Sequence, residues 1–485
     1  MTTLDAAPAP PFCAARDRRF MLIAAILTSA LGFIDGSVVS IALPAMRASL
    51  DATLAEAQWI NNAYMLPLSA LILVGGAAGD RFGVSRVLVA GLGLFLVASV
   101  LTALAPTAPT LIAGRALKGV GAALMVPGSL ALIARAYPRD QRGWAIGVWA
   151  AASAVTTALG PILGGLVLET GADWAWRAIF AVNLPLGALA IWLLRTRTRN
   201  DVGREDATLD WPGAMLATLA LGALAWALTR LGGQGDREMT LWLGVLGCLA
   251  AMAFLFRQAR APNPMMPLGL FRSRMFSAAN IVTFALYFAL SAVLFYQPMT
   301  VIAAWGVSEI AAAAGFAPLS VFIGGLSGPV GRLADRVGPR PLVAGGAALV
   351  ALAFAGLGAT AGLRAYWSTV LPLNALMGLG MAFVVGPLST AVMAAAPDAL
   401  LGAASGVNNA VSRIAGLVAV AVMGSLAALV YAAAGGALSF AEAGGDAAHL
   451  LATDRAWAAI CWTTAALAAL ASAVAWVGLR DQSGA

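Results

Sequence analysis

The sequence predicts an all-α polytopic membrane protein. Of its 485 residues, 61% are hydrophobic and only 11% are charged, whereas about 25% of the residues of a soluble domain are charged. The mean hydropathy is +0.87. A chain of this composition cannot cover its surface with polar side chains. A soluble enzyme, a disordered protein and a secreted disulfide-rich domain are therefore excluded.

Fourteen apolar runs define the predicted helices, because a membrane span requires about 20 apolar residues. The first run is too long for the apolar core of a signal peptide, so we expect it to remain in the protein. The run at 240–256 is the shortest. The fourteen runs are 20–44, 57–78, 87–105, 110–134, 144–168, 177–194, 209–230, 240–256, 276–299, 308–328, 341–361, 367–395, 403–431 and 457–478.

Basic residues are distributed unevenly over the segments between these runs. The chain has 29 Lys and Arg against 22 Asp and Glu, a net charge of +7. With the N-terminus inside, twenty of the 29 fall on predicted cytoplasmic segments, six on outer loops and three within spans. This is the positive-inside pattern, so the basic excess requires no nucleic acid. We expect a multi-pass protein of the bacterial inner membrane with both termini in the cytoplasm.

An internal repeat divides the chain. The sequence Gly79-Asp80-Arg81-Phe82-Gly83 follows the second run, and Ala334-Asp335-Arg336-Val337-Gly338 follows the tenth. Secondary transporters are commonly built from repeats with the substrate site between them. We therefore predict two six-helix bundles and an inserted helix pair. The expected divisions are an N-terminal tail 1–19, a bundle 20–195, a linker with the two inserted helices 196–275, a bundle 276–479 and a tail 480–485.

The two repeated turns are candidate gates. A charged pair on a short turn can contact neighbouring helices in one conformation and release them in another, and glycine permits a tight turn. The alternative is that the arginines only fix the topology. The predicted gate residues are Asp80, Arg81, Gly83, Asp335, Arg336 and Gly338.

Several motifs in order resemble one known family over most of the chain. They are the two repeated turns, Asp35–Pro44 in the first run, Gly114–Gly121 in the fourth, Gly160–Gly165 in the fifth, Trp176–Phe180 with Asn183 and Pro185 in the sixth, and Leu209–Gly213 before the seventh. The sequence resembles the fourteen-helix drug:proton antiporter branch of the major facilitator superfamily. The resemblance implies the major facilitator fold, alternating access and proton-coupled export. Ser37, Ser40 and Lys118 depart from that branch, which has Thr, Asn and Gln at these positions.

Asp35 and Arg115 are the candidates for proton coupling. Asp35 is the acidic residue placed deep in a span, about 12 Å from the outer end at 1.5 Å per residue, and ionisable residues at such depth are functional candidates. The resemblance implies a coupling role for Arg115. The alternative is a fixed ion pair between two helices. Lys118 lies on the same helical face as Arg115 and either binds an anionic substrate group or extends to the interface.

A group of small residues in the fifth run matches the antiporter motif of the resembled family. Gly160, Gly164 and Gly165 permit close helix contact, and Pro161 can kink the helix. Such a helix would seal the proton path, although packing alone would also account for the pattern.

The predicted substrate cavity contains aromatic, amide and basic residues. Aromatic and Met side chains accommodate varied apolar ligands. Three deep cations against one deep carboxylate favour neutral or anionic substrates over lipophilic cations. The candidates are Trp59, Asn61, Asn62, Tyr64, Lys118, Tyr287, Tyr296, Gln297, Asn374, Met377, Asn409 and Arg413.

The expected function is export of lipophilic drugs or secondary metabolites by a monomer that contacts membrane lipids. Protons are the coupling ion, and the sequence has no nucleotide-binding loop of the Gly-x-x-x-x-Gly-Lys-Ser/Thr type. Three separated cysteines and one histidine predict no metal site or other cofactor, and no catalytic group is expected. The alternatives are a proton-coupled importer of a small organic anion and a non-transporting membrane sensor.

Overall fold

A computed structural model describes residues 12–204, 208–231, 236–397, 400–444 and 446–480. The predicted tails 1–19 and 480–485 lie partly outside these residues. The first half of the chain forms α1 (Arg18–Leu50), α2 (Leu54–Phe82), α3 (Val84–Ala103), α4 (Ala108–Ala136), α5 (Arg139–Leu168), α6 (Ala175–Ala181) and α7 (Asn183–Arg197). Two further helices follow, α8 (Trp211–Arg230) and α9 (Arg237–Arg260). The all-helical prediction is confirmed.

The second half forms a second group of helices, with turns of π-helix before α11 and α14. Its elements are α10 (Arg274–Pro298), η3 (Met299–Ala304), α11 (Glu309–Ala314), α12 (Ala317–Val337), α13 (Pro339–Thr360), η5 (Tyr366–Val370), α14 (Leu371–Ala394), α15 (Leu401–Ala433) and α16 (Ala447–Gly478). Short 3₁₀ turns are η1 (Ala15–Asp17), η2 (Leu268–Arg272) and η4 (Ala361–Leu363).

Thirteen helical segments of the described chain are long and apolar enough to cross a membrane. They correspond to all the predicted runs except 144–168. That run falls within α5, a helix of 30 residues in which Leu159–Leu168 is a shorter apolar segment. The chain is a multi-pass membrane protein, and the count of fourteen spans stays a prediction.

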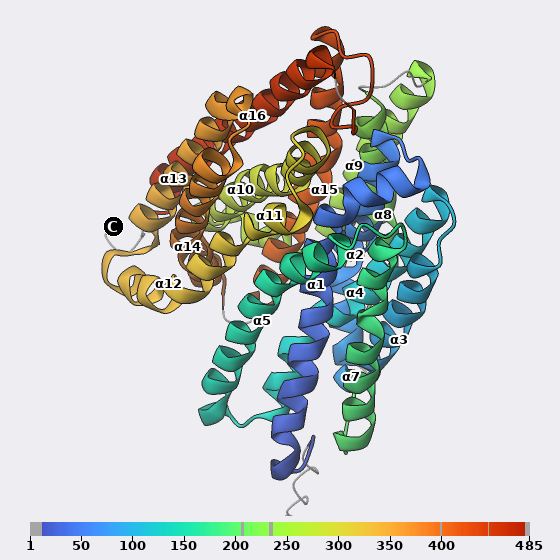
Figure 1. Cartoon of the computed structure of the whole chain (residues 1–485). Coiled ribbons are helices and arrows are strands. Elements are labelled where there is room, and N and C mark those ends of the chain that lie inside the picture. Colours follow the sequence, from blue (N-terminus) through green and yellow to red (C-terminus); the bar gives the residue numbers. More distant parts are fainter. Residues whose placement is uncertain (1–11, 205–207, 232–235, 398–399, 445, 481–485) are drawn as a thin grey trace, which may run out of the picture.

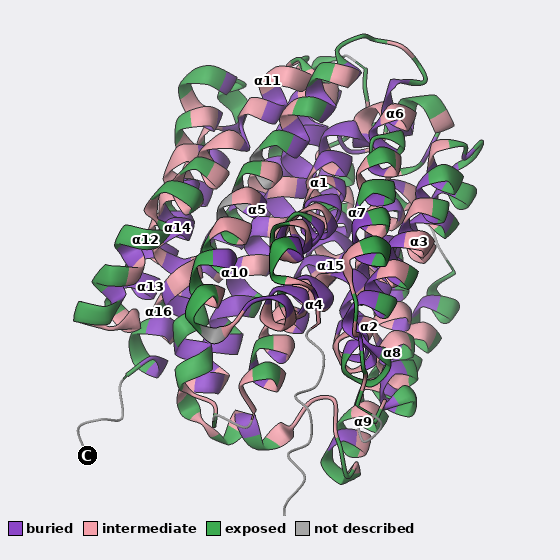
Figure 2. Ribbon diagram, turned by 90° about the horizontal axis from the view of Figure 1, so that it is seen from below, coloured by how far each residue is buried: buried purple, intermediate pink, exposed green. Residues whose placement is uncertain are grey.

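The helices pack as two bundles side by side (Figure 1). In the first, α4 packs against α2 and α3, and α1 against α5 and α4. In the second, α13 packs against α14 and α16, and α10 against α15 and α16. The bundles meet where α2 contacts α15 and where α5 contacts α11 and α12. Buried residues gather between and within the bundles, while the outward faces are exposed (Figure 2).

The inserted pair lies at one side of the contact between the bundles. Helix α8 packs on both α2 and α15, and α9 packs on α8. The Oγ of Ser425 in α15 donates to the carbonyl of Leu228 at 2.5 Å, and the ring of Trp59 in α2 lies 5.2 Å from that of Trp226. Helix α8 therefore joins the two bundles, whereas most of α9 is exposed, as expected of a helix that faces lipid.

The two repeated turns have the same backbone form but different surroundings. Gly83 and Gly338 both have positive φ, 101° and 76°, which only glycine adopts easily. The segment after α7 lies on the first turn: Arg204 N donates to Asp80 O at 2.7 Å, and Arg86 N donates to Asp201 Oδ2 at 2.9 Å. In the second turn Asp335, Arg336 and Val337 are exposed.

Candidate functional site

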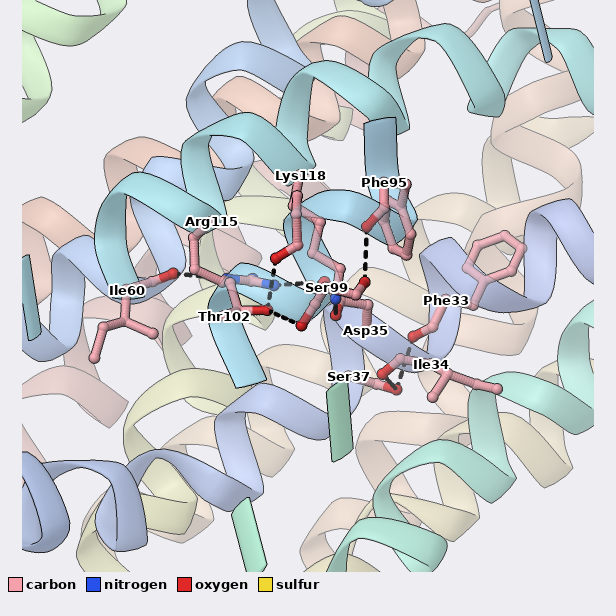
Figure 3. A network of polar contacts seen from close by, with 11 residues as sticks. Phe33, Ile34, Asp35, Ser37, Ile60, Phe95, Ser99, Thr102, Arg115 and Lys118 are labelled. Carbon is pink, nitrogen blue, oxygen red and sulfur yellow. Dashed lines mark hydrogen bonds and ion pairs between the residues drawn. The ribbon is translucent and has the colours of Figure 1, made fainter. Parts of the chain in front are cut away.

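A buried cluster of three charges lies between α1 and α4 (Figure 3). Arg115 Nη1 donates to Asp35 Oδ2 at 2.5 Å, and Lys118 Nζ donates to Asp35 Oδ1. Asp35 is 1% exposed and both cations are 0% exposed. Each carboxylate oxygen thus has its own cation, and the cluster carries a formal charge of +1. The predicted ion pair between two helices is present, with Lys118 as an additional partner.

Helical spacing and aromatic rings hold the two cations in place. Arg115 and Lys118 are three residues apart, so both face α1. Arg115 Nε donates to the carbonyl of Ile60 at 2.9 Å, and its guanidinium carbon lies 4.4 Å from the centroid of the Tyr64 ring. Lys118 Nζ lies 4.6 Å and 4.7 Å from the ring centroids of Phe95 and Phe180. Cation–π contacts of this kind stabilise a desolvated charge.

A cavity of about 220 Å³ lies between the bundles, next to the cluster. Asn61, Tyr64, Pro161 and Arg413 are predicted site residues that line it. Tyr64 is shared between the two sites, since its ring also lies under Arg115. The other lining residues are Gly32, Phe33, Gly36, Ser37, Ser40, Met65, Ser291, Leu294, Phe295, Phe316, Leu319, Ser320, Gly416 and Val420.

A larger cavity of about 780 Å³ opens at the end of the molecule that carries the first repeated turn. Its walls come from α2, α3, α4, the start of α15 and the segments before α8 and after α9, and include Asp80, Asn409, Arg204 and Asp210. Asn409 therefore lines a different cavity from Arg413, and its role in binding substrate stays a prediction.

At the opposite end the bundles are in contact. Arg47 of α1 donates to the carbonyls of Phe440 and Ala441 at 3.2 Å and 3.4 Å, in the loop between α15 and α16. A cavity of about 770 Å³ also lies at this end, between the start of α2, the end of α8 and the end of α15.

The antiporter motif lies where α5 contacts α1 of its own bundle and α11 of the other bundle. A Cβ atom on Gly160 would come within 2.7 Å of Ser37 Oγ in α1. One on Gly165 would come within 3.0 Å of Glu309 O and Ile310 Cα in α11. Gly164 is similarly close to Val38. Glycine is therefore required for close contact of α5 with α1 and α11.

Among the candidate gate residues that the structure describes, those of the first repeat contact other side chains, whereas Asp335 and Arg336 of the second repeat form no ion pair. Asp80 lies 3.9 Å from Arg135, which also lies 3.5 Å from Asp201. Arg81 packs against the Phe82 ring. Asp335 and Arg336 are exposed and have no ion pair in the described part of the chain. Their gating role stays a prediction.

Several predicted cavity residues instead hold helices together. The Tyr296 hydroxyl donates to the carbonyl of Val420 at 2.5 Å and accepts from Gln58. Asn374 Nδ2 donates to the carbonyl of Gly315 at 3.1 Å. Trp59 packs on Trp226. Asn62, Gln297 and Met377 are buried and Tyr287 is partly buried; they, like Lys118, do not line the 220 Å³ cavity.

Sequence reasoning missed the face that α1 presents to this cavity. Phe33, Gly36, Ser37 and Ser40 all line it, at the three- and four-residue spacing of one helical face. That spacing was a readable signal. Ser291 and Ser320 carry no such signal, since they lie singly in apolar helices.

Two helical bundles around a cavity, with buried charges beside it, define a membrane transporter rather than an enzyme. The chain belongs to the Major Facilitator Superfamily, whose model matches residues 25–420. It is 33% identical over 415 residues to the methylenomycin A resistance protein of Bacillus subtilis (strain 168), covering 83% of this chain and 87% of that protein. It is 30% identical over 403 residues to the tetracenomycin C resistance and export protein of Streptomyces glaucescens, covering 81% and 72%.

Solved structures support the fold. A crystal structure of a D-xylose-proton symporter superposes with a TM-score of 0.67 and 17% identity, covering 96% of this chain and 99% of that one. A bacterial homolog of the human lysosomal transporter Spinster, in an inward-facing and unoccupied conformation, also gives 0.67, at 16% identity and the same coverage.

Proposed function

We propose that the protein exports small lipophilic compounds across the bacterial inner membrane in exchange for protons. The observation that carries this proposal is the charge cluster of Asp35, Arg115 and Lys118. Tyr64 contacts this cluster and also lines the 220 Å³ cavity, called the central cavity below. The relatives named for antibiotic resistance and export support the direction of transport.

Proton exchange follows from the charges of the cluster. While both cations contact Asp35, its carboxylate has no free oxygen for a proton. A movement of α1 away from α4 would remove the cations, and the exposed carboxylate would then take up a proton. Because Ser37, Gly36 and Phe33 of the same helix line the cavity, such a movement would also reshape the substrate site. Loading of protons and binding of substrate are thereby coupled through α1 and Tyr64.

The proposed orientation follows from the arginines. Placing the basic segments in the cytoplasm puts both termini and the 780 Å³ cavity on that side, and the 770 Å³ cavity on the outer side. This orientation fits fourteen spans, with α5 as the fifth, and alternating access by a monomer embedded in lipid. The proposal needs no cofactor beyond protons.

The membrane potential supplies enough energy for one-for-one exchange. One charge moving through 100 mV yields about 2.3 kcal/mol. At 1.4 kcal/mol per tenfold ratio, this sustains roughly a fifty-fold gradient of a neutral compound.

Transport into inverted membrane vesicles tests the proposal. A drug-susceptibility panel in a pump-deficient host would first supply a compound to which the protein confers resistance. Vesicles acidified inside should accumulate that compound, and a protonophore should abolish the accumulation. Expulsion of preloaded compound would instead indicate an importer, and the absence of any flux would favour a sensor.

A further inference from the structure

Arg413 stands apart from the other deep cations because it has no carboxylate partner. It lies on α15 and lines the 220 Å³ cavity. Its Nε is buried and lacks a hydrogen-bond partner, and no ion pair involving it occurs in the described part of the chain. Arg115 and Lys118, by contrast, both contact Asp35.

Among the described residues that line the cavity that Arg413 faces, none is acidic. Its polar groups are the hydroxyls of Ser37, Ser40, Ser291, Ser320 and Tyr64 and the amide of Asn61. Asp35 is not among the lining residues, and each of its oxygens accepts from a cation. The cavity therefore presents one uncompensated positive charge to whatever enters it.

Arg413 is partly buried, with its Nε fully buried. A partly buried guanidinium without an acidic partner is stabilised by a ligand anion that pairs with it. The guanidinium has a planar set of donors that matches a carboxylate in bidentate geometry. The rest of the lining is largely apolar, with Phe33, Leu294, Phe295 and Phe316 prominent. The site thus combines an anion-binding group with walls for a lipophilic body.

We propose that Arg413 binds the carboxylate, or a chemically similar anionic group, of the transported compound, and that the substrates are small lipophilic organic anions. This deepens the proposed export function, on which it rests for its physiological meaning. Arg413 belongs to the second bundle, whereas Ser37, Ser40 and Asn61 belong to the first. An anion held at Arg413 therefore contacts both bundles and draws them together around the cavity.

Equilibrium binding to the purified full-length protein tests this assignment. The probes are 2-naphthoate, 2-naphthamide and 2-naphthylmethylammonium, which share one ring system and differ in charge. Because a hydrogen bond to a charged group contributes about 1.5–3 kcal/mol, naphthoate should bind at least about tenfold more tightly than naphthamide. The ammonium should bind more weakly than either. Isothermal titration calorimetry measures all three.

Substitution of Arg413 supplies the second arm. Arg413→Gln should reduce the preference for naphthoate over naphthamide to about one, and Arg413→Lys should leave an intermediate preference because the charge stays but the bidentate geometry is lost. The matched control is Arg237→Gln at the exposed start of α9, which should keep the full preference. Naphthoate binding no tighter than naphthamide to the unmodified protein, whether both bind or neither does, would overturn the proposal. So would a preference that survives Arg413→Gln.

Two further measurements separate this inference from folding effects and from the export proposal. Arg413→Gln should melt at the same temperature as the unmodified protein or higher, because an unpaired charge is removed. A clearly lower melting temperature would identify Arg413 as a structural residue. The binding experiment uses no proton gradient. Naphthoate binding at Arg413, combined with no pH-driven flux of the resistance compound in vesicles, would therefore refute proton-coupled export and leave the assignment of Arg413 as an anion-binding residue intact.

Discussion

At the scale of single residues, one carboxylate contacts two cations. Asp35 accepts from Arg115 and from Lys118, and all three side chains are buried. Loss of the carboxylate would leave two adjacent cations in a buried site, whereas loss of Lys118 would leave a neutral pair. The two changes therefore differ greatly in their expected effect on stability.

Asp35→Asn should lower the free energy of unfolding by about 3–5 kcal/mol, the usual effect of removing one partner from a buried pair. Lys118→Gln should change it by much less. Unfolding in a detergent series measures both. The double variant Asp35→Asn with Lys118→Gln keeps the cluster charge at +1 and should recover part of the lost stability. An Asp35→Asn protein as stable as the unmodified one would contradict this account.

At the scale of helices, α5 depends on glycine where it touches the other bundle. A methyl carbon on Gly165 would lie 3.0 Å from the backbone of Glu309 and Ile310. Gly147, on the same helix, has no neighbouring atom within 4 Å of the corresponding carbon. The two positions therefore separate a contact effect from the general cost of a β-branched residue in a helix.

Gly165→Val should push α5 away from α11 and abolish transport while the protein still inserts. Gly147→Val should retain transport, because both variants carry the same change in helix propensity. Vesicle uptake, normalised to the amount of protein, compares them. Equal uptake by the two variants would show that the contact of α5 with α11 is dispensable.

A residue of the segment after α7 caps the start of α3, although the two are far apart in the sequence. Asp201 accepts from Arg86 N at 2.9 Å, in the first turn of α3, and so performs the role of a helix N-cap. Asp201→Ala should lower the unfolding free energy by about 1 kcal/mol, because a part-buried donor at the start of a helix loses its partner. Asp335→Ala, at the exposed second turn, should shift it by about 0.5 kcal/mol or less. Similar losses in both variants, measured by thermal unfolding, would contradict the capping role.

At the scale of the whole molecule, an arginine links the two bundles at one end. Arg47 reaches from α1 to the carbonyls of Phe440 and Ala441, beside a cavity of about 770 Å³, and the cavity of about 780 Å³ lies at the other end. In the proposed orientation this contact lies on the outer side, and we expect Arg47 to restrict access from that side to the 220 Å³ cavity.

Arg47→Gln should increase opening of that side several-fold. A cysteine at Ser291, which lines the central cavity, reports it through a membrane-impermeant maleimide added outside. The exposed Cys248 would be replaced by Ala; Cys13 and Cys461 are buried. Arg237→Gln is the surface control and should leave labelling unchanged. Unaltered labelling in the Arg47→Gln variant would show that Arg47 does not restrict opening of the outer side.

The cavity residues show where prediction from sequence ends. Arg413 and Asn61 could be placed at the cavity because deep polar groups avoid lipid. Tyr296 and Trp59 have the same residue types as true cavity residues, but they contact Val420 and Trp226. Residue type alone does not distinguish a lining side chain from a packing one.

The apolar runs and the two repeated turns can be read directly from the order of the residues. The same reading shows that Asp35 and Arg115 must find partners, because apolar length and buried charge are local properties. Which partners they find depends on tertiary packing. Asp35 is separated from Arg115 and Lys118 by 80 and 83 residues, and only the packing of α1 on α4 brings both cations to one carboxylate. Helix packing likewise leaves Arg413 alone in its cavity, because which helix faces meet depends on contacts between residues far apart in the chain.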